Sequence, residues 1–167
     1  MRIEIHQEEI TMRISAKDNR HFLIAVISVC FFLYAFVLPM TLYAAGEITA
    51  WGYNYYGQCN VPEPNTDFKA IAAGTHHSLG LKADGSIVAW GPNWDGECNV
   101  PEPNTNFTAI AAGYRHSLGL KTDGSIAAWG DNGLGKCNVP EPNTGFTAIA
   151  AAWYHSLGLK QDGSIVA

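Results

Sequence analysis

Charged side chains are scarce in this sequence, and the few that it has form no basic stripe. Only 15% of the residues are charged. Residues 47–167 contain eleven acids against six bases, so this part of the chain carries the whole net charge of -5. Because phosphate groups are bound by clustered lysine and arginine side chains, we expect no nucleic acid partner.

The sequence also lacks the patterns that carry common catalytic or metal chemistry. It has neither the C-x-x-C nor the H-x-x-x-H spacing that would support a metal site. No Ser-His-Asp order, glycine-rich phosphate loop or pair of catalytic carboxylates is present either. The sequence therefore predicts no catalytic residues, no metal and no cofactor, and it favours a protein that is not an enzyme.

The N-terminal part has the features of an export signal. Residues 22–38 read FLIAVISVCFFLYAFVL without a charge, Arg13, Lys17 and Arg20 precede them, and small residues follow at positions 44–46. A basic start, an apolar centre and a small-residue exit are typical of a secretory signal. We predict a signal peptide or membrane anchor over residues 1–46. Seventeen apolar residues lie at the short end of what spans a bilayer as a helix, so cleavage and anchoring through 22–38 both stay open. Either way, we expect the mature chain to be secreted or in the cell envelope, touching the membrane only through this segment.

The rest of the chain is a sequence repeat. Residues 48–86, 87–125 and 126–164 align without gaps, 28 of 39 positions are shared by all three copies, and a fourth copy starts at 165. Such a period is the signature of a repeat architecture.

Within each copy the local pattern indicates short antiparallel strands. Phe68 to Ala73 alternates with period two, His77 to Leu81 alternates again, and Ile87 to Trp90 follows the Asp84-Gly85 turn. A proline-rich connection such as residues 100–104 comes next, and prolines do not fit inside a sheet. One small meander buries too little surface to fold alone, so we expect the repeats to stack as propeller blades in an all-β fold.

The shared residues resemble a known family. The run A-I-A-A-G-x-x-H-S-L-G-L-K-x-D-G-S-I-V-A-W-G-x-N-x-x-G-Q is similar to the repeat of the RCC1 (regulator of chromosome condensation) family, and the likeness covers residues 47–167. The resemblance implies a β-propeller fragment of about three blades out of a family total of seven. The C-N-V-P-x-P connection looks like that of the exported bacterial branch of the family, in which such propellers can be pure protein binders.

Several repeated residues are expected to be structural. We expect each histidine to bond to backbone within its own blade and each aspartate to shape its turn before glycine. The three repeated cysteines are expected to be half-buried thiols, with one disulfide between neighbouring blades left as the alternative. In the third copy Ala152 replaces the glycine found at 74 and 113, and we expect strain there if that glycine requires a positive φ. The structural set comprises Trp51, Trp90, Trp129, His77, His116, His155, Asp84, Asp123, Asp162, Cys59, Cys98 and Cys137.

The positions that vary between copies point to recognition. They gather in loops or at strand ends and are rich in tyrosine, tryptophan, histidine and arginine, the residue types favoured at interface hot spots. Neutral drift after duplication is the alternative explanation. The hypothetical partner-binding residues are Tyr53, Tyr55, Tyr56, His76, Trp94, Tyr114, Arg115, Trp153 and Tyr154.

These observations favour a non-catalytic, exported module that binds a protein or surface ligand or serves as a scaffold. The first alternative is the recognition arm of a larger exported enzyme or surface protein. The second is a regulator similar to the family's guanine-nucleotide exchange factor, although an exported acidic chain does not match that role. An open arc of blades also predicts self-association through its unpaired faces.

Overall fold

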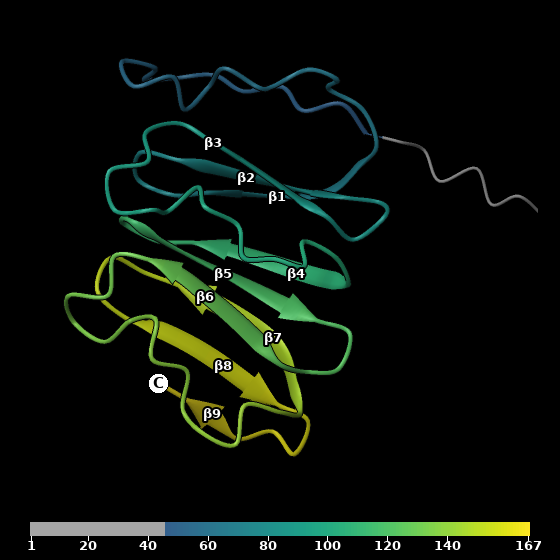
Figure 1. Ribbon diagram of the computed structural model, residues 1–167, viewed down its shortest axis with the longest axis vertical. Coiled ribbons are helices and arrows are strands. Elements are labelled where there is room, and N and C mark those ends of the chain that lie inside the picture. The colour runs from purple at the N-terminus through teal and green to yellow at the C-terminus, as the bar shows by residue number, and fades with distance from the viewer. Residues whose placement is uncertain (1–45) are drawn as a thin grey trace, which may run out of the picture. The chain divides into compact units, whose positions relative to one another are not determined.

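The computed structural model describes residues 46–167, and this part of the chain folds into three consecutive antiparallel sheets (Figure 1). The predicted signal or anchor over residues 1–46 lies outside the described residues, apart from Gly46. Within residues 46–167 there is no helix, which confirms the all-β prediction. Among the described residues, no helix has the length and apolar character needed to cross a membrane.

Each sheet is a meander of three strands in sequence order, and we call each sheet a blade. Blade 1 contains β1 (Phe68–Ala73), β2 (Ser78–Lys82) and β3 (Ile87–Trp90). Blade 2 contains β4 (Phe107–Ala112), β5 (His116–Lys121) and β6 (Ile126–Gly130). Blade 3 contains β7 (Phe146–Ala151), β8 (Ser156–Lys160) and β9 (Ile165–Val166). The predicted strands at 68–73 and 87–90 are confirmed.

The blades pack face to face around two apolar clusters. Leu79, Leu81 and Ile87 of blade 1 meet Phe107 and Trp129 of blade 2. In the second cluster Leu118, Leu120 and Ile126 of blade 2 meet Phe146 of blade 3. Each cluster is therefore shared between two blades, as expected for a meander too small to bury a core alone.

A phenylalanine ring and a glycine explain how the strands of one blade fit together. In blade 2 the Phe107 ring lies flat on β5, where a Cβ at Gly119 would come within 2.5 Å of the ring atom Cε1. The same clash recurs in blade 1 between Gly80 and Phe68. Only a residue without a side chain fits under the ring, which is why glycine stands mid-strand despite its low strand preference.

The turns have the predicted chemistry. In blade 1 the Asp84 carboxylate oxygen Oδ1 accepts the backbone N–H of Ser86 at 2.9 Å and its hydroxyl at 2.7 Å, and Gly85 has a φ of 85°. These hydrogen bonds from Ser86 lower the pKa of Asp84. The same turn recurs at Asp123 and Asp162, so the aspartate series is structural, as predicted.

Candidate functional site

The loops at one end of the blades bring eight aromatic rings into a single connected network. We call this network, together with Arg115, the aromatic surface. The rings come from the segment before β1, from the β1–β2, β4–β5 and β7–β8 turns, and from the β3–β4 connection. It contains all nine residues predicted to bind a partner: Tyr53, Tyr55, Tyr56, His76, Trp94, Tyr114, Arg115, Trp153 and Tyr154.

The network starts in a tyrosine cluster and crosses to blade 1. The Tyr55 and Tyr56 centroids lie 4.9 Å apart at an interplanar angle of 90°, and Tyr53 is stacked 6.3 Å from Tyr55. Tyr56 then meets Trp94 edge to face at 4.9 Å, and His76 lies 5.4 Å from both Tyr56 and Trp94. Edge-to-face and offset contacts of this kind are the preferred geometries of aromatic pairs.

The second half of the network connects blade 2 with blade 3. The centroid of Tyr114 lies 5.7 Å from His76 and 5.5 Å from Trp153, and Tyr154 completes the row 6.0 Å from Trp153. Because 57% of Trp153 and 56% of Tyr154 remain solvent exposed, these rings stabilise one another without forming a core. Large contiguous exposed apolar patches are typical of interaction sites, which makes this row of rings the candidate site.

Arg115 lies inside this network rather than beside it. Its guanidinium carbon is 4.8 Å from the ring centroid of Trp94 and 5.2 Å from that of Tyr114. Its Nη1 donates to Asp95 Oδ2 at 3.1 Å. The hydrogen bond to Asp95 is the largest cause of a raised pKa for Arg115. The faces of Trp94 and Tyr114 therefore already hold one cation.

Two buried charged residues that the sequence analysis did not single out lie in the β3–β4 and β6–β7 connections. Glu97 is 0% exposed, its Oε2 accepts the backbone N–H of Asp95 at 2.8 Å, and its Oε1 has no hydrogen-bond partner among the described residues. Lys136, at the same repeat position in the next copy, is also buried and donates to Asp131. The sequence signal was available, because the position that holds Gln58, Glu97 and Lys136 also differs in every copy.

The repeated histidines join one blade to the next. His77 Nε2 lies 2.9 Å from Ser117 Oγ, and Ser117 Oγ donates at 2.9 Å to the Glu97 carbonyl. Because Ser117 has a single hydroxyl proton, His77 Nε2 must be the donor in the first bond. His116 and Ser156 repeat the arrangement at 3.0 Å. We call these contacts the histidine–serine links.

The expectation that each histidine bonds to backbone within its own blade is wrong for the imidazoles of His77 and His116. The reason is that the serine acceptor lies on the following blade, a contact that repeat spacing alone does not reveal. Burial lowers the pKa of His77 to about 4, with His76 contributing. Burial, and then the charge of Lys136, lowers the pKa of His116 to about 4. His155, on the last described blade, is exposed.

The histidine–serine links also show why the first two copies have glycine where the third has Ala152. Neither Gly74 nor Gly113 has a positive φ, so the predicted backbone strain at position 152 has no basis. Glycine is needed at 113 for another reason, since a Cβ there would lie 2.3 Å from His116 Cε1 and 2.5 Å from the Ala152 carbonyl. The third copy has alanine at this position, and its histidine, His155, is exposed in the described part of the chain.

Two of the three repeated tryptophans, Trp90 and Trp129, have the same role. The indole N–H of Trp90 donates to the Gln58 carbonyl and that of Trp129 to the Glu97 carbonyl, each at 2.9 Å. Trp90 and Trp129 are buried, whereas Trp51 is 84% exposed. Trp51 therefore does not perform, within the described residues, the packing role expected of the series.

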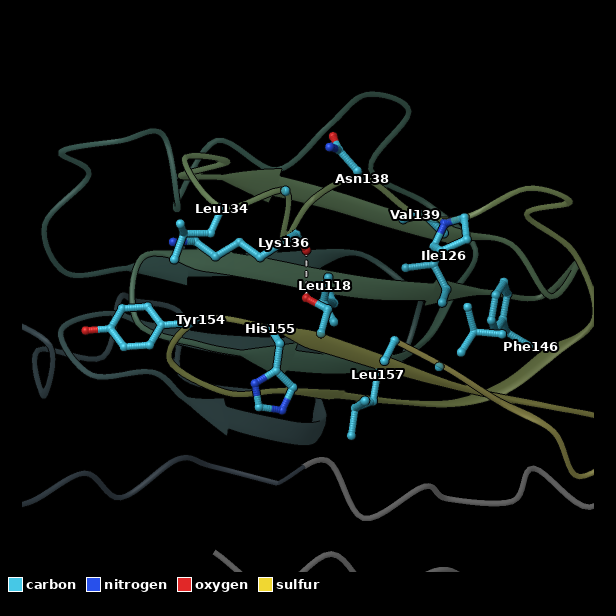
Figure 2. A pocket seen from close by; sticks show the side chains of 16 residues that line it. Leu118, Ile126, Leu134, Lys136, Asn138, Val139, Phe146, Tyr154, His155 and Leu157 are labelled. Atoms are coloured by element: carbon cyan, nitrogen blue, oxygen red, sulfur yellow. Dashed lines mark hydrogen bonds between the residues drawn. The ribbon is translucent and has the colours of Figure 1, made fainter.

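A pocket on blade 3 lies at the repeat position that corresponds to the Trp129 site of blade 2. It measures about 240 Å³ and lies among Leu118, Phe146 and Val166, with Tyr154 and Leu134 at its rim (Figure 2). Ser156 Oγ donates to the Lys136 carbonyl at 2.7 Å inside it (Figure 2). Ser117 and the Glu97 carbonyl make the same bond in blade 2, where the Trp129 indole is the second donor. The pocket thus matches a packing position of the repeat and is not our candidate site.

The cysteines are partly buried free thiols, which confirms that prediction for Cys59, Cys98 and Cys137. Cys98 Sγ lies 3.4 Å from the Pro92 carbonyl, and burial raises the pKa of Cys98 to about 11. A thiol with so high a pKa is unreactive at neutral pH. Within residues 46–167 no three histidine, cysteine or acidic side chains are grouped closely enough to hold a metal ion.

Comparison with known proteins agrees with the fold. The family model of the regulator of chromosome condensation (RCC1) repeat matches residues 68–98 and 107–136. A search of curated proteins finds no match.

Solved structures give the same result at the level of the fold. Prp20p of Saccharomyces cerevisiae, described with its binding to Gsp1p and histones, superposes with a TM-score of 0.62 at 24% identity over 72% of this chain and 40% of that chain. Yeast RCC1 (Prp20) bound to Kap60 gives 0.60 at 24% identity, with 72% and 39% covered. The receptor kinase CR4 ectodomain of Physcomitrella patens gives 0.58 at 27% identity, with 70% and 32% covered. The chain thus spans less than half the length of these structures.

Proposed function

We propose that this chain is a non-catalytic, exported protein-binding or scaffold module that holds its partner on the aromatic surface. Its residues 68–98 and 107–136 match the model of the RCC1 repeat, and its fold is similar to that of solved RCC1 structures. The observation that carries this proposal is the connection of eight rings from separate loops into one network across three blades. Neutral drift at exposed positions gives no reason for such a connection. Tyrosine, tryptophan and arginine are also the residue types that supply most of the binding energy at protein interfaces.

Similar solved proteins bind other proteins. The yeast structures are described with Kap60, Gsp1p and histones as partners. Their identity to this chain supports the fold alone, so we transfer neither those partners nor a nucleotide-exchange activity. What supports a protein partner here is the aromatic surface itself.

The non-catalytic part of the proposal rests on structural roles for the residues that look chemically active. The three aspartates hold turns, and His77 and His116 are held in links between blades with lowered pKa values. Export rests on the sequence of residues 1–46. Secretion of the full chain, with N-terminal sequencing of the released protein, tests that part separately.

The binding surface is tested by changing Tyr55, Trp94, Tyr114 and Trp153 together to alanine. We expect an unchanged far-ultraviolet circular dichroism spectrum and loss of partner capture in a pull-down analysed by mass spectrometry. The matched control is Trp51→Ala, because Trp51 is more exposed than any of the four and, among the described residues, forms no ring–ring pair with the network. Equal capture by both variants would exclude the aromatic surface as the binding site.

A further inference from the structure

The aromatic surface already shows which kind of group its rings accept. Arg115 reaches from the β4–β5 turn and lays its guanidinium over both Trp94 and Tyr114. Ring faces attract cations because the π-electron density there is negative. A planar guanidinium can stack on a ring and also bind a carboxylate, as Arg115 does with Asp95.

The charged residues around the rings also favour a cationic ligand. Both cations of this region are paired, Arg115 with Asp95 and Lys136 with Asp131. Glu97 remains without a cation bound to it, and its fully buried carboxylate has one oxygen that accepts no hydrogen bond from the described residues. A buried carboxylate with one oxygen unpaired favours an additional positive charge nearby.

Further ring faces of the network are open to a ligand. Tyr53 and Tyr55, at one end, are 67% and 77% exposed, and Trp153 and Tyr154, at the other end, are more than half exposed. No lysine or arginine within residues 46–167 is stacked on these four rings. The middle of the row is thus occupied by the protein's own arginine, and both ends remain free.

We propose that the aromatic surface binds a partner segment rich in arginine, whose guanidinium groups stack on the open tyrosine and tryptophan rings as Arg115 does in the middle of the row. This inference rests on the proposed function and specifies the chemistry of the partner. Electrostatic attraction adds to it, since residues 47–167 contain eleven acids against six bases.

The test uses the full chain and four synthetic probes, of which the three peptides have equal length. These are a peptide of alternating glycine and arginine, the same peptide with citrulline in place of arginine, a neutral proline-rich peptide, and cellohexaose. Citrulline keeps the planar shape of arginine without its charge. Binding is measured by calorimetry and by tryptophan fluorescence, to which Trp94 and Trp153 contribute among the five tryptophans.

We expect the arginine peptide to bind at least tenfold more tightly than the citrulline peptide, with an affinity that falls as salt is added. Equal binding of both peptides, or binding of none, overturns the proposal. Tighter binding of the proline-rich peptide or of cellohexaose also overturns it. The proposed function survives all of these results if the four-alanine variant still loses its natural partner, so the two failures can be told apart.

Two substitutions sharpen the test. Glu97→Gln removes a negative charge and introduces the residue that the first copy has at this position, Gln58, so the fold is kept. We expect this variant to bind the arginine peptide severalfold more weakly. Arg115→Gln empties the cation position over Trp94 and Tyr114 and releases Asp95, so the arginine peptide should bind as tightly as before or more tightly. Weaker binding of the arginine peptide by Arg115→Gln would contradict a preference of these rings for added cations and overturn the proposal. Trp51→Ala is the control, and it should leave the affinity unchanged.

Discussion

Between blades 1 and 2 His77 meets Ser117, and between blades 2 and 3 His116 meets Ser156, with the same atoms at nearly the same distance. The aromatic surface lies over the same blades, yet corresponding positions there hold Thr75, Tyr114 and Trp153. The same histidine–serine hydrogen bond recurs at both blade interfaces, whereas the loops above them differ in every copy. The comparison teaches that the blade interfaces and the aromatic surface depend on separate sets of residues, so we expect that each can be changed alone.

The largest expected effect is a loss of stability at low pH, which arises at the blade interfaces and not at the aromatic surface. The folded-state pKa of His77 and of His116 is lowered by burial from 6.5 to about 4. Between these values the unfolded chain binds protons that the folded chain does not, so stability falls as the pH drops from 6.5 to 4. Each unit of pKa difference is worth about 1.4 kcal/mol, and two imidazoles together therefore cost several kcal/mol.

Urea unfolding at intervals across that pH range measures the effect. His76 and Lys136 disfavour the charged imidazoles, and Asp131 favours the charged form of His116. The double variant His77→Gln/His116→Gln should lose most of the slope, because glutamine can still donate to the serine but does not titrate. The turn aspartates have lowered pKa values and act only at lower pH. A wild-type stability that is flat from pH 6.5 to 4 would contradict buried neutral imidazoles.

The next largest effect is expected from Phe107→Ala. The Phe107 ring is 1% exposed and covers Gly119, so its removal leaves a cavity between blades 1 and 2. Loss of such a ring costs about 3–5 kcal/mol of unfolding free energy. The measurement is the urea midpoint at neutral pH. A loss below 1 kcal/mol would mean that the blades do not depend on this shared core.

A smaller difference should separate two serines that occupy the same repeat position. Ser117 accepts from His77 and donates to the Glu97 carbonyl, whereas Ser78 only donates to the Gln58 carbonyl. Ser117→Ala leaves a buried imidazole N–H without a partner, which costs about 1–3 kcal/mol. Ser78→Ala should cost about 1 kcal/mol at most, because no described histidine is bound to it. Equal costs in parallel urea titrations would show that the histidine–serine links add no stability.

The smallest change in stability is expected on the aromatic surface. Trp153 is 57% exposed, so Trp153→Ala should change the unfolding free energy by about 0.5 kcal/mol or less while it weakens partner binding. Thermal unfolding and the pull-down assay, run on the same preparation, measure both quantities. A destabilisation comparable to that of Phe107→Ala would mean that the rings are part of the core and that the two regions are not separable.

Much of the fold could be predicted from the sequence because its signals are local. Alternation over residues 68–73, the Asp84-Gly85 turn and the return strand at 87–90 each depend on residues close together in the chain. The stacking was expected because one meander is too small to fold alone, and the RCC1 likeness agreed with it. The gathering of the nine predicted partner-binding residues in one network followed from their placement at strand ends on one side of each blade.

What could not be predicted depends on contacts between blades. The partner of His77 is 40 residues away on the next blade, and nothing in the local sequence indicates which atom it meets. The need for glycine at 113 likewise arises from the His116 ring and not from a backbone angle. Glu97 was missed because a charged residue in a loop is normally exposed, and its complete burial is visible only in three dimensions.

The histidine–serine links have a direction, since a blade offers its histidine to the blade that follows and its serine to the blade that precedes. The two faces of a blade are therefore different, and each already fits the opposite face of its neighbour. An in-frame duplication of one 39-residue unit would create a new blade interface whose two faces are already complementary. Gene duplication could thus lengthen the array without compensating mutations, and selection would be free to act on the new loops alone.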